Sequence, residues 1–264
     1  MIRNEQQPIT VVFIDGDGEL IVSDRLGGPT PKRTEHALRA GTFQPKEFDP
    51  DLYQSELKRY REVTLFVRTV RLAEKLLHKG RHVVNDGPRA INVFRHEAKV
   101  ARASLLTGRG MHLRKTTISQ LEEGRVAVGN NDVYRYSSRR DSPLARLDSS
   151  IFNHPRISSS LHKAGTIFTR VRNSSVPIRR VFMVENDLAA ALTVASVPKV
   201  LGMDPSIVTV FLTEEYGVPG VKDLMGENGI PKPPNVIFVW DIKEAANCAI
   251  MMAPLISLAH RDLM

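Results

Sequence analysis

The sequence has little of several things that define particular classes of protein. Among its 264 residues there is a single cysteine, Cys248, which excludes an intramolecular disulfide and a cysteine-rich zinc site. No apolar run approaches the roughly 18 residues that a membrane-spanning helix needs. Residues 1–7 are too polar to open a secretory signal peptide. We therefore expect a soluble, intracellular protein that is neither secreted nor inserted in a membrane.

The charge is unevenly distributed along the chain. The net charge is +8 and 42% of the residues are hydrophobic, enough for a sizeable core. Residues 81–180 contain 19 Lys and Arg against 7 Asp and Glu, whereas residues 181–264 contain 5 against 10. A basic block of this size is typical of a polyanion-binding face. We therefore predict a nucleic acid, DNA or RNA, as the partner; an acidic protein, anionic lipid or a simply solvated surface are the alternatives.

The last third of the chain carries the clearest structural pattern. Three apolar runs, at 179–187, 206–215 and 235–241, are each followed by a helical stretch. This order predicts a three-stranded parallel α/β unit. Each run ends in a carboxylate, and the carboxyl ends of parallel strands meet at one edge of a sheet. A Mg²⁺ site built from Glu185, Asp187 and Asp241, beside Glu214 and Glu215, is one interpretation. The other is that these acids cap helices.

Near the N-terminus, two β-prone runs flank the turn-forming residues Gly16-Asp17-Gly18. A β-hairpin over residues 8–23 is the prediction, because Gly and Asp tolerate the positive φ of tight turns. The stretch Phe13-Ile-Asp-Gly-Asp17 also resembles the first strand of PIN-like nuclease domains and of haloacid dehalogenase phosphatases. That resemblance implies a metal site, which we keep as the alternative.

Two helices are predicted after a loop-like arm at residues 25–48. Asp49 as N-cap, Pro50 at the first helical position and Gly80 as a stop predict a long amphipathic helix over residues 50–79. A second helix is expected over residues 88–107. The basic residues of this helix would form a stripe along one face: Arg95, Lys99, Arg102 and, if the helix continues, Arg109. Such a stripe could contact a phosphate backbone, or it could simply be a solvated face.

The remaining middle segment mixes short β-prone pieces with polar runs. In the strand expected at Val133–Tyr136, Tyr134 and Tyr136 share a face and could stack on bases, or pack on the core instead. The neighbouring basic residues of this candidate nucleic-acid site are Arg135, Arg139 and Arg140. Residues 141–176 are rich in Ser, Arg and His, which indicates a connecting region ordered only against a partner. His154 and His162 lack partners at a metal or triad spacing.

Two further resemblances concern the acidic strand ends. The stretch from Arg180 to Ala190 is similar to the opening strand and acidic pair of response-regulator receiver domains, and residues 236–242 are similar to their phosphoacceptor strand. Glu185 followed by Asp241 also resembles the Toprim fold of primases and topoisomerases. The sequence departs from both, because the strands carrying the receiver hydroxyl and lysine do not follow, and Asn186 replaces the Toprim glycine.

The combined prediction is an α/β protein in three segments. They are an N-terminal β-hairpin with a long helix (1–80), a basic mixed segment (81–176) and a C-terminal three-stranded parallel α/β unit (177–264). The predicted function is non-catalytic binding of nucleic acid, with nucleoprotein assembly as one form and no cofactor. The first alternative is a Mg-dependent enzyme acting on phosphodiesters, with carboxylates at the strand ends. The second is an interaction subunit that forms a homo-oligomer or larger assembly through its apolar C-terminal helix.

Overall fold

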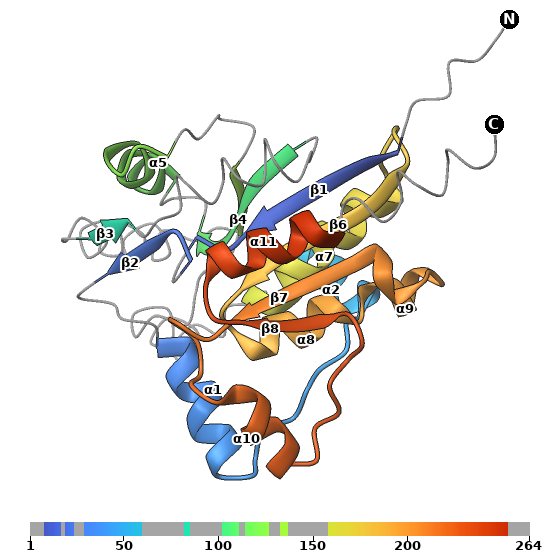
Figure 1. The fold of residues 1–264 in the computed structure, drawn as a ribbon. Coiled ribbons are helices and arrows are strands. Elements are labelled where there is room, and N and C mark those ends of the chain that lie inside the picture. Colours follow the sequence, from blue (N-terminus) through green and yellow to red (C-terminus); the bar gives the residue numbers. More distant parts are fainter. Residues whose placement is uncertain are drawn as a thin grey trace, which may run out of the picture.

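A six-stranded parallel sheet lies at the centre of the molecule, in the strand order β5-β4-β1-β6-β7-β8 (Figure 1). The structure is a computed structural model that describes residues 8–16, 19–23, 29–59, 82–84, 102–110, 114–126, 133–136 and 158–252. The sheet strands are β1 (Ile9–Ile14), β4 (Arg102–Gly110), β5 (Val133–Tyr136), β6 (Ile178–Glu185), β7 (Val208–Thr213) and β8 (Val236–Val239). A separate antiparallel pair joins β2 (Ile21–Ser23) to β3 (His82–Val84). The predicted α/β class is confirmed.

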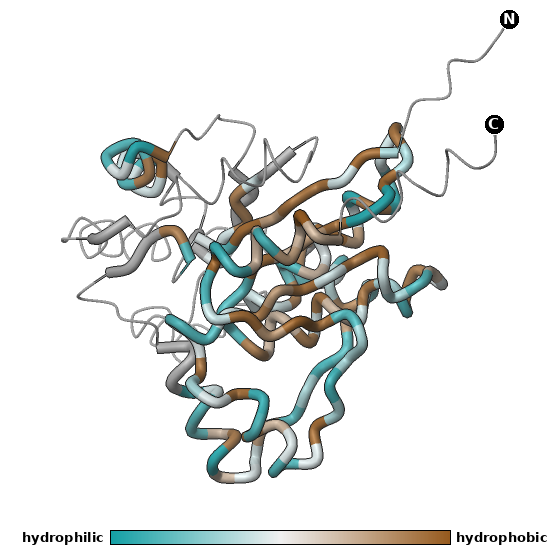
Figure 2. Tube along the Cα trace, in the orientation of Figure 1, coloured by the Kyte–Doolittle hydropathy of each residue, from teal (hydrophilic) through white to brown (hydrophobic). Residues whose placement is uncertain are grey.

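The strands of the predicted C-terminal unit are all present and are nearly continuous apolar runs. β7 is buried at every position, and β6 is buried from Val181 to Glu185. Figure 2 shows these strands as hydrophobic traces, whereas the outer helices alternate between polar and apolar residues. A parallel strand covered by helices on both faces must be apolar on both sides, which explains the runs.

Alternate residues of β1 enter two separate cores, because successive side chains of a strand point to opposite faces. Val11 and Phe13 belong to one cluster, and Val12 and Ile14 to the other. The sheet is therefore the middle layer of three (Figure 1).

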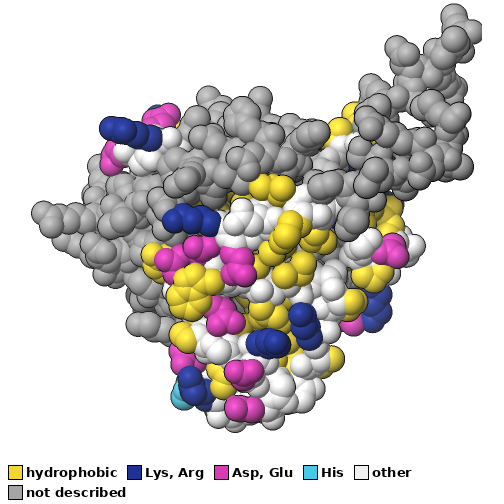
Figure 3. Space-filling view, viewed as in Figure 1, with side chains coloured by type: hydrophobic (Ala, Val, Ile, Leu, Met, Phe, Trp, Pro, Cys, Tyr) yellow, Lys and Arg dark blue, Asp and Glu magenta, His cyan; other side chains and the backbone are white. Residues whose placement is uncertain are grey.

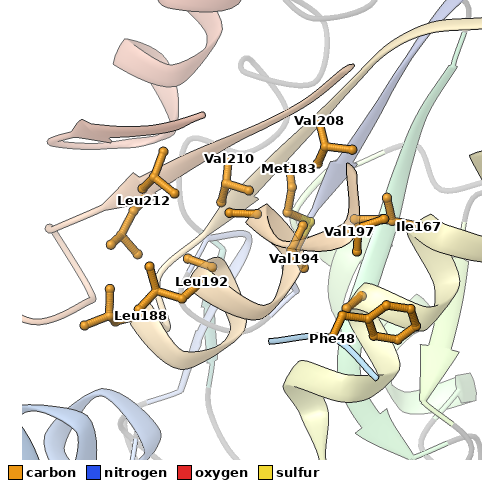
Figure 4. Packing of buried hydrophobic residues seen from close by; sticks show 14 of the residues in the cluster. Phe48, Ile167, Met183, Leu188, Leu192, Val194, Val197, Val208, Val210 and Leu212 are labelled. Carbon is orange, nitrogen blue, oxygen red and sulfur yellow. The ribbon is translucent and has the colours of Figure 1, made fainter. Parts of the chain in front are cut away.

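The larger core lies between the sheet and a group of helices. In it, side chains from strands β6 and β7 and from the helices point toward one another (Figure 4). The helices are α2 (Pro50–Arg59), α7 (Ser159–Arg172), α8 (Leu188–Ala195) and α9 (Val197–Leu201), with α1 (Pro29–Arg39) and α10 (Val221–Glu227) packed together beyond α8. The short 3₁₀ helix η2 (Pro205–Ile207) leads into β7.

The opposite face of the sheet is covered by α11 (Ile242–Met252) and α5 (Arg114–Glu123). Ile242, Ala245 and Ala249 form the buried stripe of α11, and Leu121 of α5 joins the same cluster. The prediction of a C-terminal helix holds as far as Met252, and residues 253–264 lie outside the described part. No helix in that described part is long and apolar enough to cross a membrane.

The predicted N-terminal hairpin was wrong. β1 is an inner strand, paired in parallel with β4 on one side and with β6 on the other. β2 instead pairs with β3, more than fifty residues further along the chain. β1 and β2 therefore do not pair, because β1 is buried on both faces and is too apolar for a half-exposed hairpin.

The helix predicted over residues 88–107 was also wrong for residues 102–107, the part of it that the structure describes. Residues 102–110 form strand β4 between β1 and β5, so Arg102 and Arg109 lie on a strand. The apolar run Ala103–Leu106 is short, and periodicity alone does not distinguish a buried strand from a buried helical segment. The long helix predicted from residue 50 is present as α2 up to Arg59, and residues 60–81 lie outside the description.

Two segments predicted as loop or connection are helices. Pro29–Arg39 is α1, in which prolines stand in the first turn, where they are compatible with a helix. Ser159–Arg172 is α7, with a Ser158 side chain that accepts a hydrogen bond from the Leu161 N–H (3.1 Å). α7 is packed within the protein itself, because Leu161, Ala164 and Ile167 are buried in the larger core.

Candidate active site at the carboxyl edge of the sheet

The order of the strands reverses at one point of the sheet, between β1 and β6. From β1 the chain proceeds outward through β4 and β5 on one side, and then returns to β6, β7 and β8 on the other. Ligands of open parallel sheets bind outside the carboxyl ends of the strands at such a reversal. The residues at this point are Asp15 and Gly16 after β1, and Glu185, Asn186 and Asp187 at the end of β6.

A buried lysine joins the two strand ends. Lys163 projects from α7, and its Nζ lies 3.0 Å from Asp15 Oδ2 and 2.6 Å from Glu185 Oε2. The side chains of all three residues are at most 3% exposed. Buried charges are stable only when paired and hydrogen-bonded, so this arrangement is held in place by the fold around it.

Asp15 is oriented from a second direction. Its Oδ1 accepts a hydrogen bond from the Gly16 N–H (2.8 Å). An added Cβ on Gly16 would lie 3.1 Å from both Cβ and Oγ1 of Thr107, the buried threonine of β4. Strand β4 thus places the Thr107 hydroxyl directly beside the backbone that follows Asp15.

At the end of β6, Glu185 and Asp187 lead into the start of α8. Glu185 Oε1 accepts the N–H groups of Asn186 (3.2 Å) and Asp187 (3.1 Å). Asp187 is the N-cap of α8, because its Oδ1 accepts the Ala189 N–H (3.0 Å). The same oxygen accepts the hydroxyl of Thr34 from α1 (3.4 Å), so α1 also reaches the site.

A fourth acid lies close by. Glu19 is 2% exposed, and its Oε1 accepts a hydrogen bond from the hydroxyl of Thr213 at the end of β7. Burial raises the pKa of Glu19 to about 8, with smaller upward contributions from the charges of Asp15 and Glu215. The hydrogen bond from Thr213 and the charge of Lys163 lower the pKa of Glu19, but they do not outweigh its burial. Glu19 is therefore protonated over most of the neutral range.

The site holds more acidic than basic side chains. Burial raises the pKa of Glu185 well above its ordinary value; Lys163 counteracts this, and the charges of Asp15 and Asp187 add to it. The pKa of Asp187 is raised by burial too. Burial alone would lower the pKa of Lys163, but the nearby carboxylates outweigh it and raise the pKa. One lysine thus faces three carboxylates, and an added cation would relieve their repulsion.

Magnesium fits this donor set in kind and in number. Carboxylate oxygens are hard donors, and Mg²⁺ is usually held by one or two carboxylates together with water and substrate phosphates. Among the residues that the structure describes, no three His, Cys, Asp or Glu side chains form a group able to hold a metal alone. Asp15 and Asp187 would therefore be its protein ligands, with the remaining positions open to water and substrate.

The structure brings together only part of the predicted metal site. Glu185 and Asp187 are in the cluster, whereas Asp241 follows β8, two strands away from β6 in the sheet order. Asp241 Oδ1 accepts the Glu244 N–H (2.8 Å), and Glu244 Oε2 accepts the Trp240 N–H (2.5 Å). Asp241 thus caps the start of α11, which is the helix-capping interpretation of this acid.

The predicted nucleic-acid residues that the structure describes lie on two neighbouring strands, which pair through Leu106 with Tyr134 and Gly110 with Tyr136. Arg102 and Arg109 lie on β4, and Tyr134, Arg135 and Tyr136 lie on β5. Arg95, Lys99, Arg139 and Arg140 fall outside the described residues.

Sequence reasoning missed Lys163, the residue at the centre of the cluster. A signal for its helix was available in the spacing of Leu161, Ala164 and Phe168, which follows a helical period after the N-cap Ser158. The lysine itself carries no motif, because its partners come from strands 22 and about 150 residues away. Only the fold brings them together.

Comparison with solved structures finds likenesses of fold at low sequence identity. A haloacid dehalogenase-like protein of unknown function from Agrobacterium tumefaciens str. C58 matches with 12% identity and a TM-score of 0.46, over 92% of this chain and 98% of that one. A haloacid dehalogenase-like hydrolase from Burkholderia xenovorans LB400 matches with 15% identity and a TM-score of 0.44, over 91% and 96%. DsGPDH of Dunaliella salina matches with 14% identity and a TM-score of 0.41, over 91% of this chain and 36% of that one.

No protein-family model matches the sequence, and a search of curated proteins gives no match either.

The prediction of a non-catalytic nucleic-acid-binding protein was wrong. Two of the three solved structures above are described as haloacid dehalogenase-like, one of them as a hydrolase, and none of the three is described as binding nucleic acid. Among the described residues, the fold buries carboxylates and a lysine together at the carboxyl edge of the sheet.

Proposed function

We propose that this protein is a Mg-dependent hydrolase of phosphate esters in which Asp15 is the nucleophile. The observation that carries the proposal is the buried Asp15–Lys163–Glu185 arrangement at the point where the strand order reverses. Structural ion pairs also occur in protein interiors, but here a third acid, Asp187, lies beside the pair, so that acidic side chains outnumber the single lysine. Such an imbalance is destabilising without a cation and is characteristic of functional sites.

The chemistry begins with the Asp15 carboxylate. One of its oxygens forms a bond to phosphorus while the bond from phosphorus to the oxygen of the leaving alcohol breaks. The leaving oxygen takes up a proton from solvent. Water then attacks the phosphorus of the aspartyl phosphate, gives up one proton to solvent, releases inorganic phosphate from a monoester and restores the carboxylate. A bound Mg²⁺ would offset the negative charge on the phosphoryl oxygens.

The other residues of the chain hold this nucleophile in place. The Gly16 N–H and the Lys163 ammonium bind the two oxygens of Asp15, so its orientation is set before substrate arrives. Lys163 also places a positive charge at the position where an anionic phosphoryl group meets Asp15. Glu185 holds that ammonium, and its own carboxylate is held by two backbone N–H groups.

The test uses para-nitrophenyl phosphate as a monoester and bis-para-nitrophenyl phosphate as a diester, each with MgCl₂ or with EDTA. We expect hydrolysis of at least one ester with Mg²⁺ and its loss with EDTA. Asp15→Asn should lower kcat by about 10³-fold or more, since the nucleophile is removed. Hydroxylamine should trap the aspartyl phosphate in the parent and not in the variant.

The matched control is Asp223→Asn, the same chemical change at an exposed position of α10. It should leave kcat unchanged. Full activity of Asp15→Asn, or failure of both esters to react in the presence of Mg²⁺, would overturn the proposal.

A further inference from the structure

The helix that carries Lys163 has an unusual contact on its opposite side. Gly165 is two residues beyond Lys163, about 200° around the helix axis. A Cβ built on Gly165 would lie 2.4 Å from two ring carbons of Tyr53, from α2, where ordinary contact begins at 3.4 Å. The Tyr53 ring therefore sits directly on the backbone of α7, and only glycine admits it there.

The ring is not free to move away. Tyr53 is 6% exposed, and Phe48 packs against it (ring centroids 6.0 Å) and against Phe168 of α7 (5.2 Å). The N–H of Phe48 donates to Ser196 Oγ (2.8 Å), which lies between α8 and α9. Figure 4 shows Phe48 within the same core as Ile167 and Val197. The segment that holds the ring is thus fixed to the helices that follow β6.

The residue after Gly165 is held within α7 itself. The Thr166 hydroxyl donates to the His162 carbonyl oxygen (2.9 Å), one turn back along the helix. The Tyr53 ring therefore contacts a regular helical turn, and this contact restrains the depth of α7 beside the sheet.

The Lys163 ammonium must lie within 3.0 Å of one carboxylate and 2.6 Å of another, on two different strands. We infer that Tyr53 is a positioning residue of the site: seated on Gly165, it fixes α7 at the distance from the sheet at which Lys163 contacts Asp15 and Glu185 together. The consequence for turnover rests on the proposed function, but the placement of Lys163 does not.

The decisive variant is Gly165→Ala. Its methyl group and the Tyr53 ring must separate by about 1 Å to reach ordinary contact, and a displacement of this size at a catalytic group costs about 10²-fold in rate. We therefore expect kcat to fall about 10²-fold with little change in KM. Tyr53→Phe, which keeps the ring on Gly165, should retain the parental kcat and KM.

A chemical readout follows the lysine directly and needs no activity. Parent and variant are treated with acetic anhydride, and acetylation of Lys163 is measured by mass spectrometry. The parent should react slowly, since the amine is buried and ion-paired. In Gly165→Ala the rate should rise about tenfold or more, because a displaced amine is no longer enclosed by its two carboxylate partners. Gly226→Ala, on α10 with no atom within 4 Å of the added Cβ, is the matched control and should behave as the parent.

Two Tyr53 variants keep the test decisive if Gly165→Ala does not fold. Tyr53→Phe retains the ring on Gly165 and should protect Lys163 nearly as well as the parent. Tyr53→Ala removes the ring and should expose Lys163 to acetylation. Folded Gly165→Ala or Tyr53→Ala protein in which Lys163 is acetylated at the parental rate would overturn the inference. If acetylation follows this pattern while no phosphate ester is hydrolysed, the proposed function fails and the positioning role stands.

Discussion

Acids follow the central strands and the outer strands of the same sheet, yet the two groups are built differently. At β1 and β6, Asp15 and Glu185 are buried and share the Lys163 ammonium. At β8, Asp241 and Glu244 bind backbone N–H groups at the start of α11. Figure 3 shows acidic and apolar side chains together on the outer surface where β8 leads into α11. The half-exposed Asp241 serves the local helix, whereas the buried acids depend on a residue from a distant element.

The difference teaches that an acid at a strand end is ambiguous until its position in the strand order is known. A capping acid gains free N–H groups from its own helix and needs nothing else. An acid at the reversal of strand order is surrounded by other strand ends and loses its water. Asp187 belongs to both groups, because it caps α8 and also shares the buried charge cluster.

The largest expected effect comes from removing the cation of the central group. Lys163→Met keeps the length of the side chain but leaves the buried carboxyl groups of Asp15 and Glu185 without the cation that they share. We expect a loss of about 3–5 kcal/mol in the free energy of unfolding, together with loss of hydrolytic activity. Urea unfolding at pH 7 and the ester assay measure the two effects.

Lys199→Met is the control for that change. Lys199 also forms an ion pair, with Glu47 at 2.7 Å, but both side chains are about 70% exposed. Exposed pairs contribute about 0–1 kcal/mol, so this variant should unfold nearly as the parent does and retain its activity. Equal stability losses in the two lysine variants would remove the distinction between buried and exposed pairs.

A smaller effect is expected from Glu19, and it depends on pH. Its folded pKa of about 8 lies above the ordinary value of 4.5. Its protonation therefore favours the folded state fully below about pH 4.5, and this contribution is lost as the pH rises toward 8. Glu19→Gln removes the titrating group, so relative to the parent it should gain stability of a few kcal/mol between pH 5 and pH 8.5, as measured by urea unfolding.

Glu227→Gln, at an exposed position of α10, controls for the loss of one carboxylate. If Glu19→Gln and the parent lose stability in parallel from pH 5 to pH 8.5, then Glu19 does not hold a proton in the folded protein.

The outer part of the sheet was predictable from the sequence, and the central site was not. β6, β7 and β8 read as apolar runs because each is buried on both faces, and the acids that begin α8 and α11 are local signals. β1 has the same apolar character, but the Gly16–Gly18 turn signal favoured a hairpin. Short-range turn chemistry does not reveal that β1 lies between β4 and β6.

The central site resisted prediction because its parts are distant in sequence. Asp15, Lys163 and Glu185 come from β1, α7 and β6, and no spacing rule links them. The serine-rich surroundings of α7 also favoured a connecting region, although Ile167 and Phe168 are buried core residues. Charge counts over residues 81–180 gave equal weight to Lys163 and to residues elsewhere in the segment, and so concealed the one lysine that the fold buries.

The smallest expected effect concerns the outer group. Asp241→Ala removes the oxygen that accepts the Glu244 N–H at the start of α11. Loss of an N-cap costs about 1 kcal/mol, so the free energy of unfolding should fall by about that amount. Asp241→Ser should recover most of it, because serine caps helices nearly as well as aspartate. Both variants should keep full ester hydrolysis and an unchanged Mg²⁺ requirement, since Asp241 lies outside the central cluster. A loss of Mg²⁺-dependent activity in Asp241→Ser, with its stability restored, would place the acid of β8 in the site and end the contrast between the two groups.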